Sequence, residues 1–287
     1  MNDMKKVLWV ILLMGYSVGL WAGDKPAYVL YNAKGKKVGY AKMVKNLLKQ
    51  EVVLFGEIHN NPISHWLELK IAQDCGGKRA ILMGAEMFER DNQQPLNQYM
   101  EDKITAKGLD SLARLWKNYK TDYAPLVNFA KENRVGFVAT NVPRKFATMV
   151  SKGGFEALNS LGPLEKTWVA RLPIAFDANL PGYQKMLKMM GDHATPNMAK
   201  AQALKDATMA YSILEHLNMD ELFIHYHGSY HSEFHEGIMW YLKQARATMR
   251  IATIATVSQK DISSLLPEHL DKADFIICVE DDMTGTY

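Results

Sequence analysis

Two short stretches of this 287-residue chain end in the same arrangement of reactive residues. Residues 52–59 read Val-Val-Leu-Phe-Gly-Glu-Ile-His, and residues 222–231 read Leu-Phe-Ile-His-Tyr-His-Gly-Ser-Tyr-His. Each is an apolar run that closes with Gly-x-x-His, so His59 and His231 follow comparable turns. An apolar run ended by glycine predicts a buried strand and a tight turn. Imidazoles at these turns could bind a metal, a cofactor or a substrate.

Carboxylates accompany both histidines. Glu57 stands two residues before His59, and Glu86 ends another strand candidate. In an open parallel sheet the carboxyl ends of the strands form the crevice where ligands bind. We therefore expect these two glutamates, His59 and His231 to form one site. Such a site could hold a divalent metal with an open position for water, with Glu57 or Glu86 as the general base of a hydrolase.

Further histidines lie near the second motif. His225 and His227 alternate along one strand, and we expect His225 to be a core residue. His231 and His235 are four residues apart, the spacing that puts two imidazoles on one helix face. The segment lacks the Glu that directly follows the first His of a zinc metalloprotease helix. We therefore favour His231 over His235 as a site residue.

A helix is predicted over residues 200–209, and Gln202, Asp206 and Met209 share one of its faces. A polar pair on a face that belongs against the core indicates contact with the crevice. The alternative is the solvated face of an amphipathic helix. Arg90, shortly after Glu86, is a further crevice candidate.

Aromatic and methionine-rich segments raise a different possibility. A tyrosine can ligate haem iron, and Met-rich, aromatic helices suit a flat apolar macrocycle. The candidates are Trp116, Tyr119, Tyr123 and Tyr183. Each could instead pack in the core or at an interface, and the spacing selects none of them.

The N-terminus has the pattern of a secretory signal peptide. Lys5 and Lys6 precede the apolar run 7–14, and Ala22 offers a cleavage end. A retained membrane anchor is the alternative, but the run is short for a full span. We expect residues 1–22 to be removed and residues 23–287 to be exported to the periplasm or cell surface. No Cys lies near the cut, so a lipoprotein is not expected.

The net charge and the cysteine content bear on the kind of partner and on disulfide bonding. The formal net charge of +3 becomes +2 without residues 1–22, which hold Asp3, Lys5 and Lys6. Such a weak balance, with no stripe of Lys and Arg, argues against a nucleic-acid partner. Cys75 and Cys278 are compatible with a disulfide or with two small buried side chains.

Strands alternate with helices along the chain, which predicts an α/β fold with a mostly parallel sheet and flanking helices. Strands are predicted at 27–31 (in a hairpin with the turn 32–36), 52–56, 79–86, 135–140, 222–227, 250–257 and 275–279. Helices are predicted at 40–49 and from 60–62 to 74, where Asn and Pro mark the start. Residues from about 144 to 198 contain no good strand and predict a smaller all-helical insertion.

In these features the chain resembles the ChaN-type haem-binding proteins of bacterial iron uptake, in a superfamily with the Tiki proteases and erythromycin esterases. The resemblance covers about residues 28–260. It rests on six segments in order, namely 53–62 with Gly-Glu-x-His, 86–94 with Glu-Met-Phe-Glu-Arg-Asp, 123–126, 139–144, 202–210 and 228–231. Family members are often lipoproteins, whereas this N-terminus lacks the lipid-accepting Cys.

The resemblance implies an exported protein that binds haem at the interface of a homodimer, with an outer-membrane haem receptor as a possible partner. A tyrosine of one subunit then ligates the iron, while a His and a Lys of the other hold the propionates. We assign the tyrosine to Tyr123 or Tyr183 and the propionate partners to His193 and Lys188. Haem binding does not use the Gly-x-x-His motifs, so a metal-dependent hydrolase is the alternative function.

Overall fold

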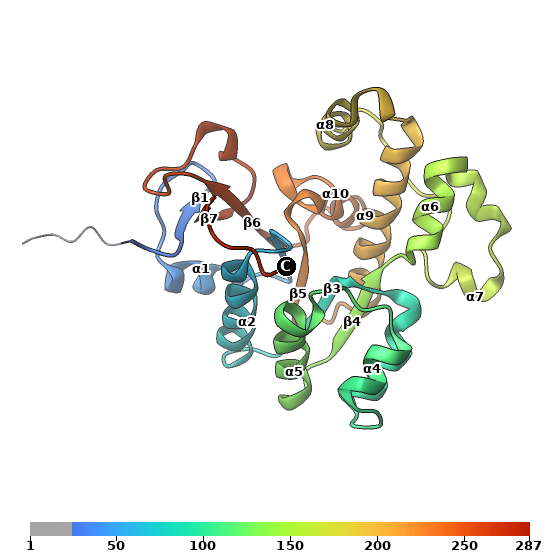
Figure 1. Cartoon of the computed structure of the whole chain (residues 1–287), viewed down its shortest axis with the longest axis horizontal. Helices are drawn as coiled ribbons and strands as arrows, with labels where there is room; N and C mark the ends of the chain where they lie inside the picture. The colour runs from blue at the N-terminus through green and yellow to red at the C-terminus, as the bar shows by residue number, and fades with distance from the viewer. Residues whose placement is uncertain (1–24) are drawn as a thin grey trace, which may run out of the picture.

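The computed structural model describes residues 25–287, so the predicted signal peptide lies outside the described residues. Seven strands form one sheet in the order β1-β7-β6-β2-β5-β3-β4 (Figure 1). Neighbouring strands run parallel except β1, which is antiparallel to β7. The predicted α/β fold with a mostly parallel sheet is confirmed. Within residues 25–287 no helix combines the length and apolar character needed to cross a membrane.

The strands follow the predicted apolar runs closely. They are β1 (Val29–Asn32), β2 (Val52–Glu57), β3 (Ile81–Glu89), β4 (Phe137–Asn141), β5 (Leu222–Gly228), β6 (Ile251–Gln259) and β7 (Phe275–Glu280). Every residue of β2, β4 and β5 is buried, as expected for parallel strands covered on both faces. The expected N-terminal hairpin is replaced by pairing of β1 with β7, and a single bridge joins Tyr31 to Lys37.

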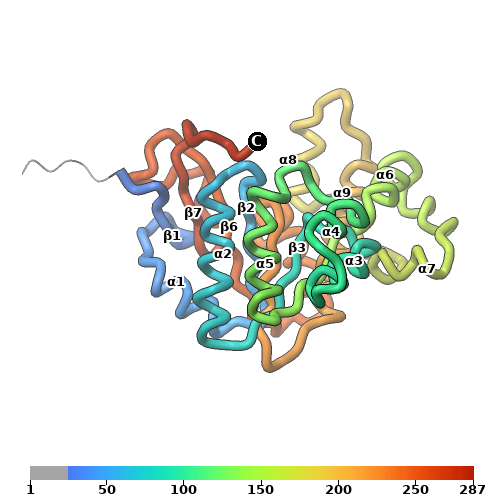
Figure 2. Tube along the Cα trace, turned by 60° about the horizontal axis from the view of Figure 1, so that its bottom comes forward, coloured from blue at the N-terminus to red at the C-terminus, as the bar shows by residue number. Residues whose placement is uncertain are grey.

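Helices cover both faces of the sheet. One face carries α1 (Tyr40–Leu47), α2 (Pro62–Gly76), α3 (Gln93–Met100), α4 (Ala106–Leu112) and α5 (Ala124–Glu132), with α2 between α1 and α5 (Figure 2). The other face carries α9 (Pro196–His216) and α10 (Ile238–Ala245) (Figure 1). The side chain of Asn61 caps α2 by accepting hydrogen bonds from two backbone amides, as its sequence signal predicts.

The stretch from 144 to 198, all of which the structure describes, contains helices and turns but no strand. Its helices are α6 (Arg144–Gly153), α7 (Pro163–Lys166) and α8 (Pro181–Met190). Both α6 and α8 pack against α9, which itself packs against β4. These helices therefore stand beside the sheet at the side of β4 (Figure 1).

The two Gly-x-x-His strands are neighbours at the centre of the sheet. Gly56 of β2 is in register with His227 of β5, and Glu57 is in register with Gly228. From β2 the chain builds outward through β3 and β4, whereas from β5 it builds the other way through β6 and β7. Such a reversal of strand order is where α/β sheets open a crevice. The predicted convergence of the two strand ends is confirmed.

Candidate functional site

A first cluster of titratable side chains surrounds the end of β2 and consists of Glu57, His59, His65, Glu68 and Tyr123. Glu57 Oε1 accepts hydrogen bonds from the Tyr123 hydroxyl at 2.7 Å and from His59 Nδ1 at 2.6 Å. His65 Nδ1 lies 3.2 Å from Glu57 Oε2 and 3.2 Å from Glu68 Oε2. His65 and Glu68, which α2 carries on its buried face, are not among the predicted site residues.

Burial and neighbouring charges both shift the pKa values of the titratable groups in this first cluster. Burial alone would raise the pKa of the Glu57 carboxyl, but the hydrogen bond from His59 and the positive charge of the nearby His65 lower it to about 2. Burial and the Glu57 carboxylate raise the pKa of Glu68 well above its usual range. Burial opposes the charged form of His65, yet its contacts with the Glu57 and Glu68 carboxyl groups raise its pKa to about 11. The charged forms of Glu57 and His65 are therefore favoured, whereas for Glu68 the neutral form is favoured.

A second cluster joins β3, β5, α9 and the 3₁₀ turn Ser229–His231, and its members are Glu86, Tyr183, Gln202, Asp206 and His231. His231 Nδ1 lies 2.5 Å from Asp206 Oδ1, and His231 Nε2 lies 3.1 Å from Glu86 Oε1. The backbone amide of Gly228 donates to Glu86 Oε2 at 2.9 Å. Gln202 Nε2 lies 3.0 Å from His231 Nδ1. The polar pair predicted on the helix of residues 200–209 thus contacts the crevice.

The second cluster holds its histidine in the charged form. Burial disfavours the imidazolium, but the Glu86 and Asp206 carboxylates together raise the pKa of His231 to about 10. Burial would raise the pKa of Glu86, whereas the charge of His231 lowers it well below its usual range. Both nitrogens of His231 face carboxylates, so its ring is fixed in position and its proton is held.

The close approach of His59 and Gly228 joins the two clusters. A Cβ atom on Gly228 would lie 2.7 Å from His59 Nε2, so only glycine leaves room for the ring. Burial lowers the pKa of His59, but the hydrogen bond to Glu57 and the charge of Glu86 raise it overall. Its side chain is 37% exposed, so one edge of the ring remains open to a ligand.

The four residues predicted to bind a metal form two hydrogen-bonded pairs, Glu57 with His59 and Glu86 with His231. Within residues 25–287, the group whose ligand atoms all lie within 4.8 Å of one another is instead Glu57, His65 and Glu68. The group that the geometry offers for a metal therefore differs from the predicted set. Glu86 is instead held by His231 and the Gly228 amide.

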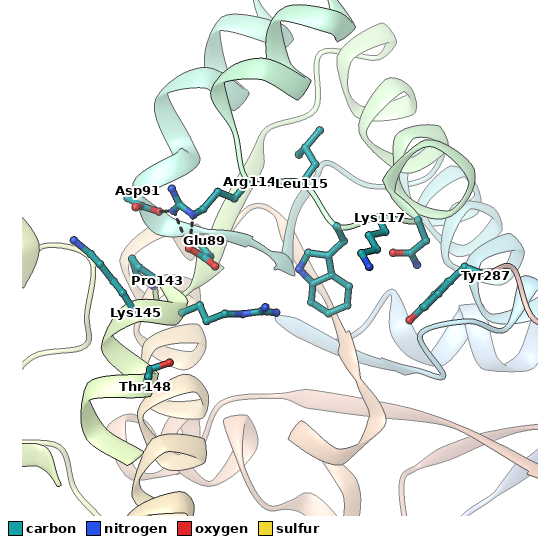
Figure 3. A pocket seen from close by; sticks show the side chains of 12 residues that line it. Glu89, Asp91, Arg114, Leu115, Lys117, Pro143, Lys145, Thr148 and Tyr287 are labelled. Carbon is teal, nitrogen blue, oxygen red and sulfur yellow. Dashed lines mark hydrogen bonds and ion pairs between the residues drawn. The ribbon is translucent and has the colours of Figure 1, made fainter. Parts of the chain in front are cut away.

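Two adjoining cavities open next to the clusters, with Glu89, Trp116, Arg144 and Thr148 in the walls of both. The larger measures about 1030 Å³ and is also lined by Asp91, Arg114, Leu115, Lys117, Asn118, Pro143, Lys145 and Tyr287 (Figure 3). The smaller measures about 480 Å³ and is also lined by His59, Glu86, Asn141, Val142, Ala147, Ser151, Met186, Met190, Met198, Ala201, Gln202 and Lys205. Both volumes are ample for a small molecule or cofactor.

The tyrosines predicted to ligate iron are buried away from these cavities. The Tyr123 hydroxyl donates to Glu57, and the Tyr183 hydroxyl donates to Asp206 at 3.0 Å. Burial and these carboxylates raise the pKa of both phenols. Neither presents a free hydroxyl to a ligand, and Tyr287 is the tyrosine that lines the larger cavity.

The other predicted contact residues also lie elsewhere. Lys188 and His193 are exposed at the end of α8 and in the turn after it, outside both cavity linings. Arg90 donates to Ser212 at 2.6 Å and pairs with Glu215 at 2.8 Å, so it ties the end of β3 to α9.

His225, His235 and the two cysteines lie outside both cavity linings. His225 is fully buried, as predicted, and its Nε2 lies 2.7 Å from the Thr140 hydroxyl. His235 does not share a helix face with His231, because its backbone is left-handed with φ 63° and breaks the helix. Cys75 and Cys278 are both free and buried.

The fold defines the class of protein, an α/β protein with a candidate ligand site at the carboxyl edge of its central parallel strands. Residues 43–242 match the profile of a family described as haem-binding uptake, Tiki superfamily, ChaN. The match covers more than half of the chain. The protein belongs to this ChaN family of haem-binding proteins.

Solved structures agree with the fold. The structure of ChaN from Campylobacter jejuni, described with cofacial haem binding, is 19% identical and aligns with a TM-score of 0.66 over 88% of this chain and 97% of that one. A succinoglycan biosynthesis protein aligns with a TM-score of 0.50 at 11% identity, over 88% of this chain and 94% of that one. At these identities the likeness shows the fold alone.

A plant protein shares part of the sequence. RETICULATA-RELATED 5, a chloroplastic protein of Arabidopsis thaliana, is 28% identical over 123 residues. This region is 40% of the present chain and 17% of the plant protein, so the chain spans about a sixth of that relative.

Proposed function

We propose that this protein binds haem in the two adjoining cavities, as an exported protein of bacterial haem and iron uptake. The observation that carries the proposal is the lining, which combines a flat indole and thioethers with cationic side chains. Trp116, Met186, Met190 and Met198 supply apolar surface for a porphyrin. The walls of the two cavities also carry Arg144, Lys117 and Lys205.

These three cations are suited to the haem propionates. Arg144, Lys117 and Lys205 form no ion pair with any residue from 25 to 287, whereas the nearby Arg114 is paired with Glu89 at 2.7 Å and with Asp91. Arginine binds carboxylates through two parallel hydrogen bonds. Arg144 lines both cavities, so we assign it as the main propionate partner within one subunit. Lys188 and His193 stay assigned to the propionates of a haem shared with a second subunit.

We assign the iron ligand to Tyr287. Haem supplies an iron that a phenolate can ligate. Tyr287 is 67% exposed and lies across the larger cavity from Asp91 and Lys145 (Figure 3). Its ring is free to approach a porphyrin from the open side, which Tyr123 and Tyr183 cannot do without breaking buried hydrogen bonds.

The N-terminal pattern and the family support further proposals on export, dimerisation and the partner of this protein. We propose that residues 1–22 direct export to the periplasm or cell surface, because they combine two lysines, an apolar run and a small residue at the cut. We also propose a haem-bridged homodimer, because both cavities are open and a haem in either would keep an exposed face. An outer-membrane haem receptor is the partner class that fits such a carrier.

A haem titration tests this proposal. Purified protein is titrated with haem, followed by visible absorbance, with light scattering on the same samples. We expect saturable binding and a shift from monomer to dimer, and loss of the phenolate-to-iron absorbance in Tyr287→Phe. Arg144→Ala should weaken binding about tenfold, since a hydrogen bond to a charged group contributes about 1.5 kcal/mol.

Matched controls come from outside the cavities. Tyr211→Phe and Arg171→Ala alter an exposed pair whose hydrogen bond measures 3.1 Å and should leave haem affinity unchanged. Absence of saturable binding would remove the proposal. Equal binding by the parent and the Arg144 and Tyr287 variants would move the haem to another place.

A metal-dependent hydrolase is the second candidate, and one observation favours it. His59 lines the smaller cavity with its Nδ1 bound to the buried Glu57 carboxylate, which is the arrangement of a general base oriented by an acid. Activity on ester or peptide substrates that disappears in His59→Ala, while haem binding persists, would support it. Inactivity of the metal-supplemented protein on both substrate classes would exclude those reactions.

A further inference from the structure

The buried face of α2 meets the end of β2 in a closed triad formed by Glu57, His65 and Glu68. All three are buried, and the Glu57 and Glu68 side chains have no exposed surface. None of the three lines either cavity. The triad is therefore separate from the haem site, although Glu57 also holds His59.

The surroundings of His65 place a hydrogen on Nε2 whether or not the ring is charged. His65 Nε2 lies 3.1 Å from the backbone carbonyl oxygen of His59 and 3.3 Å from Asp122 Oδ2. Both partners accept hydrogen bonds, so Nε2 is the donor. The carboxylate of Asp122 is held in turn by Asn118 at 2.6 Å and by Thr286 at 2.6 Å. His65 Nδ1 consequently points into the triad.

Two carboxylates meet at this nitrogen with few donors. Nδ1 lies 3.2 Å from Glu57 Oε2 and 3.2 Å from Glu68 Oε2, and it hydrogen-bonds only to the latter. Within the described part of the chain, Glu57 Oε2 and Glu68 Oε1 are buried and receive no hydrogen bond. Unpaired buried carboxyl oxygens are costly, so an ion that contacts both of them would stabilise this group of side chains.

The geometry suits one ion. The ligand atoms of the three residues all lie within 4.8 Å of one another. Neighbouring ligands of a tetrahedral Zn²⁺ lie about 3.4 Å apart, given bonds of about 2.1 Å. One imidazole nitrogen with carboxylate oxygens matches the preferences of Zn²⁺ and Mn²⁺. An Nε2–H bound to a carboxylate and a carbonyl is the usual support of a metal-binding histidine.

We propose that Glu57, Glu68 and His65 Nδ1 bind one divalent transition-metal ion, Zn²⁺ or Mn²⁺, in a closed site outside both cavities. The ion binds His65 Nδ1 and the carboxyl oxygens of Glu57 and Glu68, so any proton on these atoms is released to solvent. The bound ion fixes Glu57 and, through it, the ring of His59.

The test measures the ion directly. Full-length protein is dialysed against EDTA and then titrated with ZnCl₂ or MnCl₂, with calorimetry and elemental analysis of the bound ion. We expect one ion per chain and release of protons, read from the dependence of the heat on buffer. Glu68→Gln and His65→Gln should each weaken binding by at least about tenfold, which is the effect of losing even an outer partner.

Two further variants make the result decisive, namely the control His216→Gln and the second-cluster variant His231→Gln. His216→Gln changes a histidine on the exposed end of α9 and should leave binding unchanged. Glu68→Gln keeps the shape of the side chain, so it decides the outcome even where His65→Gln fails to fold. Stoichiometric binding that survives Glu68→Gln but disappears in His231→Gln would place the ion in the second cluster and overturn the proposal. The proposal would also be overturned if neither Zn²⁺ nor Mn²⁺ bound stoichiometrically.

Discussion

Replacing Asp206 by Asn should change how the stability of this protein depends on pH. His231 is only 6% exposed and lies between Asp206 and Glu86. Its pKa is raised from 6.5 to about 10. This difference corresponds to roughly 5 kcal/mol of preference for the charged imidazole in the folded protein, at about 1.36 kcal/mol per tenfold change in the ionisation constant.

The direction of the pH effect on stability follows from the pH at which the unfolded and folded states lose the His231 proton. The unfolded chain releases the His231 proton near pH 6.5, whereas the folded protein holds it to about pH 10. The stabilisation is therefore complete below pH 6.5 and is lost as the pH rises toward 10. Between pH 6.5 and 9 this residue alone should lower the free energy of unfolding by about 3 kcal/mol.

Asp206→Asn removes one of the two carboxylates that hold this charge. The variant should be less stable by about 3 kcal/mol at pH 6.5, the lower end of the cost of breaking a buried ion pair. Because the pKa of His231 falls, the further loss between pH 6.5 and 9 should shrink to half or less of the parent value. Urea unfolding followed by tryptophan fluorescence, on EDTA-dialysed protein at both pH values, measures the two quantities.

Comparison with the parent isolates His231. His65, whose pKa is raised to about 11, contributes the same downward trend in parent and variant, so it cancels. Tyr183→Phe removes a hydroxyl that donates to Asp206 without removing charge, and it should keep the parental pH dependence. Equal losses between pH 6.5 and 9 in the parent and in Asp206→Asn would refute the assignment of the His231 charge to Asp206.

Three further variants test the framework that positions the site, each by urea unfolding. Gly56→Ala should lower the free energy of unfolding by about 1–3 kcal/mol, because its Cβ would lie 2.7 Å from the backbone Cα of Ser229; a neutral effect would show that the strand end yields. Leu67→Ala should cost about 2–5 kcal/mol, since this α2 side chain is fully buried against the sheet, and a cost below 1 kcal/mol would contradict that packing. Asn61→Ala should cost about 1 kcal/mol through loss of the α2 cap, with Asn61→Asp near the parent; equal values for the two would refute the capping role.

Much of this architecture could be predicted because the central strands are covered on both faces. Such strands are continuous apolar runs, so β2 and β5 are visible in the sequence and their Gly-x-x-His turns mark the site. Asp206 could also be predicted from the sequence, because a carboxylate on the core face of a helix needs a buried partner. The pairing of β1 with β7 could not be predicted, since its two strands lie at opposite ends of the chain.

Two members of the first cluster, His65 and Glu68, were not predicted, and the reasons differ between them. Glu68 lies on the buried stripe of α2 with Ile71 and Cys75, at the i, i+3 and i+7 positions, and such a charged residue is a detectable signal. His65 carries no comparable signal, because its value depends on the carbonyl of His59 and on Asp122, which only the tertiary fold brings near. The spacing of His231 and His235 misled for a similar reason, since the left-handed backbone at His235 is not encoded by the spacing.

The three site histidines can be ranked by how their nitrogens are used. His231 has a carboxylate at each nitrogen, and His65 has acceptors at Nε2 and two carboxylates at Nδ1, so both rings are fixed and hold positive charge. His59 has one carboxylate, at Nδ1, and an edge exposed at the smaller cavity. A ring held on one side only can exchange a proton with a ligand or turn toward it. His59 is therefore the histidine through which a molecule in the cavities would sense both clusters.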